Sequence, residues 1–304
     1  MLSKFAYKRL TWIDLQSPTK EDVRKVMEKY GIHPLVAEEL LIETIRPKVD
    51  YYGNQIYLVL HFPTVTHTHN GKAWQEVDFV IGKNFLLTVH YEIIDSLLEF
   101  SKMFEVNSIL KKSNMGEHAG FLFFHIMREL YKNLASELNV VRKTLESIEE
   151  HIYSGNERVM VETISKVNRK LINFKQAVRF HKDVLDSFEI AAKDLFGEKF
   201  AAYARMISGE CSKIVSILDG HKETLSDLWD TNDSLLSSKT NETMKTLAAL
   251  AAILLPVSLI GSIFGISSNF IPYMNEPDAF FFVIGLMALA AVCMYLVSKW
   301  KRWL

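Results

Sequence analysis

The stretch that decides the fold is Leu247–Ile266, which reads LAALAAILLPVSLIGSIFGI and carries no charge. As an α-helix at ~1.5 Å per residue it spans about 30 Å, the thickness of the hydrocarbon core of a bilayer. A second charge-free stretch, Ala279–Ser298, reads AFFFVIGLMALAAVCMYLVS. Together they predict a transmembrane hairpin, because two such long and apolar spans are rare in the buried helical hairpin of a soluble protein.

The residues that flank the hairpin predict its orientation. The connection Ser267–Asp278 contains Glu276 and Asp278 but no lysine or arginine. The basic residues lie outside the pair: Lys239, Lys245, Lys299, Lys301 and Arg302. By the positive-inside rule both flanks face the cytoplasm. We therefore expect a protein of the cell (inner) membrane whose two termini are cytoplasmic, with the lipid bilayer as its surroundings.

Composition excludes several classes of function. The chain has 304 residues, with 35 basic and 36 acidic ones and a net charge of −1, so no nucleic-acid partner is expected. Its two cysteines, Cys211 and Cys293, are too few and too far apart for a disulfide framework. The sequence has no GxxxxGK[ST], HExxH, GxSxG or GxGxxG motif. We expect neither an enzyme nor a resident cofactor.

Residues 1–115 predict a cytoplasmic α/β domain. Four stretches rich in β-branched and aromatic residues are typical of strands: Leu10–Leu15, Gln55–Phe62, Gln75–Ile81 and Phe85–His90. Ser17-Pro18 predicts a helix start, with serine as N-cap and proline in the first turn, and His33-Pro34 predicts another. Gly82–Asn84 and Asn70-Gly71 are expected to form turns between strands.

Residues 116–245 predict a stalk of long helices, followed by the membrane segment 246–304. Apolar residues recur at helical spacing in His118–Ile152, Val159–Leu195 and Lys199–Ser238. Breaks are expected at 154–156 and at Gly197. Nothing stops the third helix before the membrane, so it is expected to continue to about residue 265. Such a rod would be roughly 100 Å long and would need neighbours to be stable.

One stripe of this rod, followed in steps of three and four residues, changes character along its length. Its members are Glu223, Asp227, Asp230, Ser234, Ser237, Asn241, Met244, Ala248, Ala251, Leu255, Ser258, Ser262 and Gly265. If several copies surround an axis, the stripe would line a water-filled path with an acidic mouth and hydrophobic constrictions at Met244 and Leu255. The first three acidic residues are also weak candidates for a metal site. Equally, the acidic residues could form a solvated face and the small ones a packing seam, with Gly261 and Gly265 as a GxxxG motif.

These residues resemble the CorA family of divalent-cation (magnesium/cobalt) transporters. The run TNETMKTL at 240–247 is similar to the family's approach to its pore helix. Leu255-Pro256, Gly261 and Phe264-Gly265 match its LP…G…YG pattern. Other similar strings, in the same order along nearly the whole chain, are Trp12-Ile13-Asp14, Ile45-Arg46-Pro47-Lys48, Leu87-Thr88-Val89-His90 and the tail Lys301-Arg302-Trp303-Leu304.

The resemblance implies a homopentamer with an α/β cytoplasmic domain, long stalk helices and a central pore built from the first membrane helix. It also favours the pore interpretation of the stripe. It places five residues at pore-lining positions, Asn241, Met244, Leu247, Leu255 and Ser258, and puts Asp230 near an acidic ring. The stripe adds Ala251 and Ser262. Divalent cations, Mg²⁺ above all, are then both the transported and the regulatory ions.

The loop after the first membrane helix departs from the family pattern. The family signature is Gly-Met-Asn, whose asparagines form a ring that meets the hydrated ion. Here the corresponding residues are Gly265-Ile266-Ser267. A ring of Ser267 hydroxyls would leave a wider entrance, and Asn269 could substitute for the missing amide. Since Mg²⁺ sheds water reluctantly, this ring would decide which ion passes.

Three functions remain open from the sequence. The first is a channel that passes Mg²⁺, and also Co²⁺ or Ni²⁺, driven by the membrane potential and gated from the cytoplasmic domain. The second is a proton-coupled zinc transporter similar to the ZntB branch, although Cys293 and Tyr295 are the only ionisable residues in the spans. The third is a non-conducting relative that senses ions, a hypothesis motivated by the lost asparagine ring.

Overall fold

The computed structural model describes residues 2–64, 73–109, 116–265 and 279–301. It divides into two compact units, 1–229 and 230–304. Helix α7 (Glu198–Gly265) continues from the first unit into the second, as the sequence predicts. Breaks at 154–156 and at Gly197 are confirmed as well, since one helix ends before each and another begins after it. The turn expected at Asn70-Gly71 lies outside the described residues.

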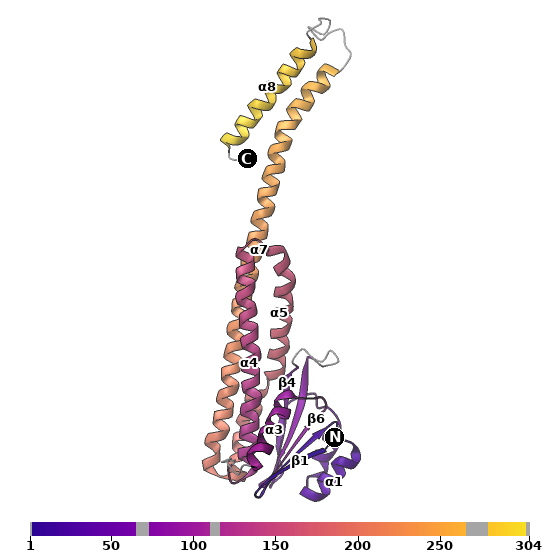
Figure 1. Ribbon diagram of the computed structural model, residues 1–304, viewed down its shortest axis with the longest axis vertical. Helices are drawn as coiled ribbons and strands as arrows, with labels where there is room; N and C mark the ends of the chain where they lie inside the picture. Colours follow the sequence, from indigo (N-terminus) through magenta and orange to yellow (C-terminus); the bar gives the residue numbers. More distant parts are fainter. Residues whose placement is uncertain (1, 65–72, 110–115, 266–278, 302–304) are drawn as a thin grey trace. The chain divides into compact units, whose positions relative to one another are not determined.

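A six-stranded mixed sheet lies at one end of the first unit, beside the long helices (Figure 1). Its strands are β1 (Leu2–Tyr7), β2 (Leu10–Gln16), β3 (Lys48–Tyr51), β4 (Ile56–Pro63), β5 (Trp74–Ile81) and β6 (Phe85–His90). They lie in the order β1-β2-β6-β5-β4-β3, and only the β2–β6 pair is parallel. The four predicted strands are confirmed. The two that the sequence did not reveal, β1 and β3, are the edge strands.

Two short helices cover one face of the sheet. Helix α1 (Lys20–Tyr30) and helix α2 (Pro34–Glu39) bury apolar side chains against β2, β4, β5 and β6. The predicted start of α1 is wrong, because Thr19 rather than Ser17 is its N-cap. The Asp22 backbone N–H donates to the Thr19 hydroxyl at 3.2 Å, and the Asp22 carboxylate accepts from the Thr19 N–H at 3.1 Å. This reciprocal capping box satisfies two backbone donors that would otherwise be unpaired. Helix α2 begins at His33-Pro34 as predicted, and His33 is its N-cap.

Four helices cover the opposite face. They are α3 (Asp95–Ile109), α4 (Ala119–Tyr153), α5 (Glu157–Val178) and α6 (His181–Phe196). Aromatic pairs join them to the strands. The Phe79 and Phe123 rings meet edge to face at 5.1 Å, and Trp12 meets Phe100 at 5.5 Å. Rings in this arrangement add stabilisation beyond their buried area, so these contacts help to fix α3 and α4 on the sheet.

The prediction of a single helix over 159–195 is wrong. The structure ends α5 at Val178 and begins α6 at His181. No proline or glycine marks this break. Buried positions continue at helical spacing across it, from Val178 to His181 and Val184. Hydrophobic periodicity alone therefore could not reveal the break.

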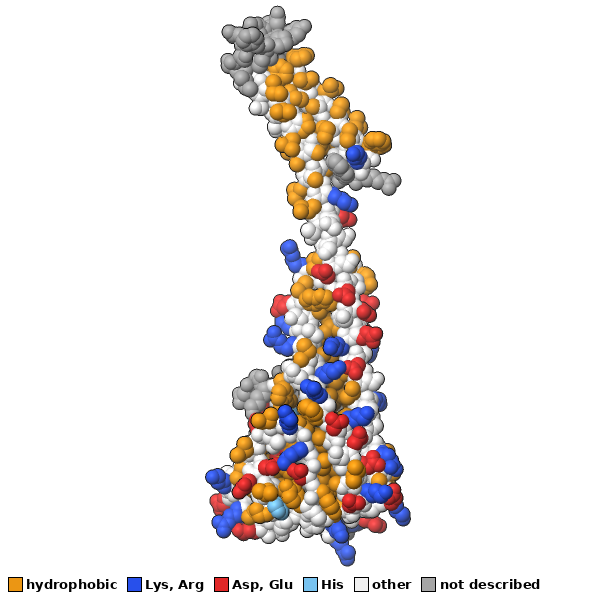
Figure 2. All heavy atoms as spheres, turned by 180° about the vertical axis from the view of Figure 1, so that it is seen from behind, with side chains coloured by type: hydrophobic (Ala, Val, Ile, Leu, Met, Phe, Trp, Pro, Cys, Tyr) orange, Lys and Arg blue, Asp and Glu red, His pale blue; other side chains and the backbone are white. Residues whose placement is uncertain are grey.

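The second unit contains the membrane hairpin. It pairs the C-terminal part of α7 with α8 (Ala279–Trp300). Among the described residues, these two helices are long and apolar enough to cross a membrane. On the face shown in Figure 2, hydrophobic side chains cover this unit, whereas charged side chains cover much of the first unit. An unpaired apolar surface of this extent is typical of contact with lipid or with other membrane helices.

Candidate functional site

The two membrane helices meet along a seam of apolar and small residues. On α7 the covered positions are Ala249, Ala252, Ile253, Pro256, Val257, Ile260, Gly261 and Phe264. On α8 they are Val283, Leu286, Met287, Ala290, Ala291, Met294 and Ser298. Both sets follow the alternating three- and four-residue spacing that keeps one face of a helix against its neighbour. The packing surface of the hairpin is thereby defined.

The sequence-predicted stripe lies on a different side of α7. Within the second unit every member of it from Asn241 to Gly265 is exposed. Met244 is 64% and Leu255 is 68% exposed. At about 100° of rotation per residue, the stripe is roughly opposite the seam with α8. Leu247, which the family pattern added, falls on the same side. The stripe therefore does not pack the two helices of one hairpin together. What it contacts must lie outside the single chain.

The two glycines of the GxxxG motif have different surroundings. A Cβ atom placed on Gly261 would lie 3.5 Å from the Met287 Cε of α8, whereas one placed on Gly265 would meet no atom of the described residues within 4 Å. Gly261 thus belongs to the seam and Gly265 to the exposed stripe. The motif does not act as one packing unit within the chain.

Helix α7 carries polar groups where it enters its apolar stretch. The hydroxyls of Thr240, Thr243 and Thr246 donate to the carbonyls four residues earlier, at 2.9 to 3.0 Å. These bonds satisfy the hydroxyls inside the helix itself. Further along, Pro256 lacks an N–H and so leaves the carbonyl of Ala252 without its helical donor. A free carbonyl at membrane depth requires a neighbour or water to satisfy it.

The remaining predicted site residues are only partly brought together. Glu223, Asp227 and Asp230 are exposed on α7, and the described residues hold no group of three histidine, cysteine, aspartate or glutamate side chains that could bind a metal ion. Gly265 is the last residue of α7. The other residues of the predicted selectivity loop, Ile266, Ser267 and Asn269, lie outside the described residues.

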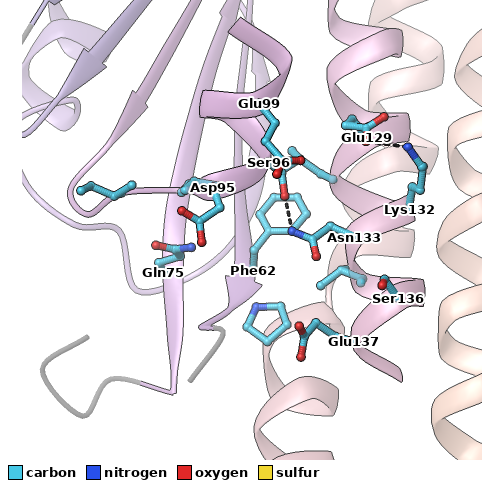
Figure 3. Close-up of a pocket in the computed structure, with 15 residues that line it drawn as sticks. Phe62, Gln75, Asp95, Ser96, Glu99, Glu129, Lys132, Asn133, Ser136 and Glu137 are labelled. Atoms are coloured by element: carbon cyan, nitrogen blue, oxygen red, sulfur yellow. Dashed lines mark hydrogen bonds and ion pairs between the residues drawn. The ribbon is translucent and has the colours of Figure 1, made fainter. Parts of the chain in front are cut away.

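A pocket of about 420 Å³ lies in the first unit beside α3 and α4 (Figure 3). Four of its carboxylates come from Asp95, Glu99, Glu129 and Glu137. Two of these are neutralised by ion pairs, Glu129 with Lys132 at 2.8 Å and Glu137 with Lys170 at 3.1 Å. The Asn133 amide donates to the Ser96 hydroxyl across the pocket. The Asn133–Ser96 bond ties α4 to α3, and the Glu137–Lys170 pair ties α4 to α5. None of these pairings provides an activated nucleophile or an acid–base pair.

Sequence reasoning missed a buried polar network between β2 and β6. The Trp12 Nε1–H donates to the Thr88 hydroxyl at 3.0 Å, that hydroxyl donates to the Asp14 carboxylate, and His90 Nε2 lies 3.2 Å from the same carboxylate. Burial opposes protonation of His90, but the bond to Asp14 and its charge outweigh this and raise the histidine pKa. The network becomes visible once β2 and β6 are aligned in parallel, because that register sets Asp14 opposite Thr88.

Comparison with known proteins identifies the fold and the family. The family model for the CorA-like Mg²⁺ transporter protein matches residues 7–300. The chain belongs to the CorA family. It is 26% identical over 296 residues to the cobalt/magnesium transport protein CorA of Thermotoga maritima, covering 97% of this chain and 83% of that protein. This CorA-family protein is therefore a membrane transporter of divalent cations and not an enzyme.

Solved structures of CorA and its relatives share the fold. The complete structure of the CorA magnesium transporter from Methanocaldococcus jannaschii has a TM-score of 0.84 at 22% identity, and covers 100% of this chain and 95% of its own. The ZntB cytoplasmic domain from Vibrio parahaemolyticus has a TM-score of 0.55 at 12% identity, and covers 76% of this chain and 89% of its own. The CorA structure thus matches the whole chain, whereas the ZntB structure, itself a cytoplasmic domain, matches 76% of it.

Proposed function

We propose that several copies of the chain assemble around an axis, with the exposed stripe of α7 lining a path for Mg²⁺ and other divalent cations such as Co²⁺ and Ni²⁺. The residues that would line it are Asp230, Asn241, Met244, Leu247, Ala251, Leu255, Ser258 and Ser262. The position of the stripe carries this proposal. It lies opposite the α7–α8 seam and is exposed within a single chain.

The chemistry of the stripe favours water over lipid. Ser258 and Ser262 present hydroxyl groups at membrane depth, whereas the neighbouring exposed positions Leu259 and Ile263 are wholly apolar. Lipid tails offer no hydrogen bonds to a hydroxyl, so a face that collects them suits a helix contact or a water-filled path. Rings of Met244 and Leu255 would narrow such a path and close it by expelling water.

Acidic side chains and the membrane potential would both favour the movement of cations into the cell. The acidic residues Glu223, Asp227 and Asp230 would raise the local concentration of cations at the cytoplasmic mouth. A divalent ion that moves inward gains ~4.6 kcal/mol for each 100 mV of inside-negative potential, from about 2.3 kcal/mol per unit charge. Entry therefore needs no nucleotide hydrolysis.

The loop that follows α7 would select the ion. Gly265, Ile266, Ser267 and Asn269 take the place of the family's signature in the sequence. A ring of serine hydroxyls, with or without the Asn269 amides, would hold a hydrated ion by outer-sphere hydrogen bonds. Because Mg²⁺ keeps its water shell, the width of this ring decides whether Mg²⁺ or a more easily dehydrated ion passes.

The assembly follows from the family likeness. We infer a homopentamer in the cell (inner) membrane, with both termini in the cytoplasm and with divalent cations acting on the cytoplasmic domain as regulators. Lys299 and Trp300 at the end of α8 suit the interface between lipid and cytoplasm. Cross-linking of the purified protein followed by mass measurement tests the number of copies.

Ion flux tests the function directly. The purified protein is reconstituted into vesicles, and entry of Mg²⁺, Co²⁺ and Zn²⁺ is measured under an imposed potential, with and without a pH gradient. Entry that follows the potential and ignores the pH gradient supports the channel. Zinc entry that requires the pH gradient assigns the protein to the proton-coupled class. Folded oligomers that pass no ion contradict both and leave an ion-sensing role.

Cysteine accessibility tests the stripe. Leu255→Cys and Leu259→Cys form a matched pair, because both side chains are well exposed, at 68% and 62%, and only Leu255 belongs to the stripe. Both are made with Cys293→Ala, since Cys293 is exposed on α8. A charged thiosulfonate reagent added from the water phase is expected to block flux through the Leu255→Cys protein and to spare the Leu259→Cys protein. Block of both or of neither would remove the stripe from the pore.

A further inference from the structure

Two acidic side chains lie buried inside the soluble unit, far along the sequence from the stripe. Glu76 and Asp78 are two residues apart on β5, so both side chains point to the face that α1 and α2 cover. Glu76 is 5% exposed and Asp78 is fully buried. Their carboxyl groups are close enough to hydrogen-bond to each other.

The hydrogen bonds of the pair are incomplete without a proton. Glu76 Oε2 accepts the backbone N–H of Thr44 at 2.6 Å, but Glu76 Oε1 and both oxygens of Asp78 are buried without a donor among the described residues. Two ionised carboxylates within hydrogen-bonding reach of each other repel, and a buried oxygen without a hydrogen-bond donor costs free energy. One shared proton corrects both faults, because it removes one charge and supplies the missing donor.

The cationic side chains near the pair that the structure describes do not neutralise it. Lys48 is engaged by Glu39 at 2.6 Å and by Asp50 at 2.7 Å. The His61 Nε2–H donates to the Thr44 carbonyl at 3.0 Å, and the same nitrogen lies 3.5 Å from Glu76. Among the described residues, the titratable groups around the pair are Glu39 of α2, Glu43 after it, Lys48 and Asp50 of β3, Tyr57 and His61 of β4, and Tyr91 and Glu92 after β6.

We propose that Glu76 and Asp78 form a buried proton-binding site, which holds one proton near neutral pH and makes the packing of the segment 40–47 depend on that proton. Thr44 links the site to this segment, because its N–H binds Glu76 and its carbonyl binds His61. The described residues near the pair contain no group of three ligands that could bind a metal ion, which favours a proton as the ligand.

The direction of the pH effect follows from linkage. Burial chiefly, and then the charge and hydrogen bond of Glu76, raise the pKa of Asp78 well above its ordinary value of 3.8. The folded protein thus binds more protons than the opened one above about pH 4, and its stability falls as pH rises through the raised pKa. When opening of the segment releases the proton, the opening constant rises about tenfold for each pH unit above that pKa.

Hydrogen exchange of the full-length protein in detergent micelles tests the site. Exchange of peptides that cover 40–47 is followed between pH 6 and pH 9 and corrected for the intrinsic rate at each pH. We expect protection at Thr44 to fall with rising pH, by up to about tenfold per unit. Asp78→Asn should abolish this dependence, since an asparagine amide can donate to Glu76 permanently. Asp194→Asn, which alters an exposed carboxylate on α6, should retain it.

Infrared spectroscopy tests independently whether a carboxyl group of the pair is protonated. The protonated carboxyl group should contribute a C=O stretching band that Asp78→Asn removes and Asp194→Asn does not. Should Asp78→Asn fail to fold, Glu76→Gln serves, since it likewise removes the shared proton. Protection that is independent of pH in the wild type, or a pH dependence that survives in the folded variant, would overturn the proposal. So would protection at pH 8 that returns on addition of Mg²⁺ alone, which would make the pair a metal site.

Discussion

Acid should destabilise the soluble unit through one buried histidine. His181 at the start of α6 is fully buried. The Tyr131 hydroxyl of α4 lies 2.9 Å from its Nδ1, and its Nε2 lies 2.7 Å from the His61 carbonyl of β4. A carbonyl can only accept, so Nε2 carries the proton and Nδ1 accepts from Tyr131. The neutral ring thereby joins two helices to the sheet. Protonation of Nδ1 would place a charge in this buried site and reverse the direction of the bond with Tyr131.

The size of this effect follows from the pKa. Burial lowers the pKa of His181 from 6.5 to about 4, against the weaker opposing effect of its bond to the His61 carbonyl. The unfolded chain then binds more protons than the folded one between these values, so stability is full above pH 6.5 and falls as pH drops toward 4. Integrated from pH 7 to pH 4.5, the loss is about 2 kcal/mol in the free energy of unfolding.

A comparison of two variants isolates this contribution. His181→Gln does not titrate, whereas His151→Gln removes an exposed histidine of α4. Denaturant unfolding of the full-length protein in micelles is followed by tryptophan fluorescence at pH 7 and pH 4.5, since Trp12 is fully buried in the same unit. Wild type and His151→Gln should lose about 2 kcal/mol more than His181→Gln on acidification. Equal losses in all three proteins would refute the assignment of a neutral, buried His181.

Three further predictions concern a helix cap, the membrane seam and the selectivity loop. Thr19→Ala should lower the free energy of unfolding by about 1 kcal/mol, measured by denaturant unfolding, because it removes the capping box of α1. Gly261→Leu should lower the thermal unfolding midpoint of the protein in micelles, because the new side chain would collide with Met287. Ser267→Asn together with Ile266→Met should change the ranking of Mg²⁺ against Co²⁺ in the flux assay, because amides replace hydroxyls in the ring.

The first two of these predictions have a matched control variant, and the third has a stated outcome that would contradict it. Ser187→Ala removes a hydroxyl that only returns to the carbonyl of Asp183 within α6, so it should cost much less than Thr19→Ala. Gly285→Leu adds the same bulk to α8 where no atom of the described part of the chain lies within 4 Å, so an equal drop in midpoint would contradict the seam. An ion ranking that ignores the double change at 266 and 267 would show that this loop does not select.

The parts of the fold that the sequence predicted have strong local signals. Two charge-free spans of membrane length need no tertiary information, and neither do strands such as Gln55–Phe62, in which nearly every residue is apolar or aromatic. The edge strand β1 alternates between exposed and half-covered positions up to Ala6, and the short strand β3 has none fully buried. Edge strands bury less apolar surface, so their hydrophobic pattern is weak.

The errors at helix boundaries have tertiary causes. Ser17-Pro18 has the composition of a helix start, yet Ser17 takes a positive φ of 45° and its hydroxyl donates to the Tyr91 carbonyl at 2.5 Å. That contact crosses 74 positions of sequence, so no local rule could detect it. The break before His181 is similar, because its benefit is the bond to the distant carbonyl of His61.

In the candidate site, too, the features fixed by a single helix could be predicted, and those fixed by tertiary contacts could not. The stripe from Met244 to Ser262 could be named from sequence because a single helix fixes which residues share a face. Sequence could not separate this face from the seam with α8, since both contain alanine, glycine and large aliphatic residues at the same spacing. The tertiary structure makes the distinction, because Met287 lies against Gly261 and no described atom lies near Gly265.

Helix α7 therefore has two surfaces with opposite requirements in its membrane part. The seam with α8 must exclude space, so it places Ala249, Gly261 and other close-fitting residues against the neighbouring helix. The opposite stripe must leave room for water, because a conducting path needs water beside Ser258 and Ser262. It also needs a hydrophobic constriction at Leu255 from which water can be expelled. Substitutions on the seam should then alter hairpin stability without changing ion preference, and substitutions on the stripe should do the reverse. A seam variant such as Gly261→Leu that changed ion ranking while the midpoint stayed constant would show that the two surfaces had been assigned the wrong way round.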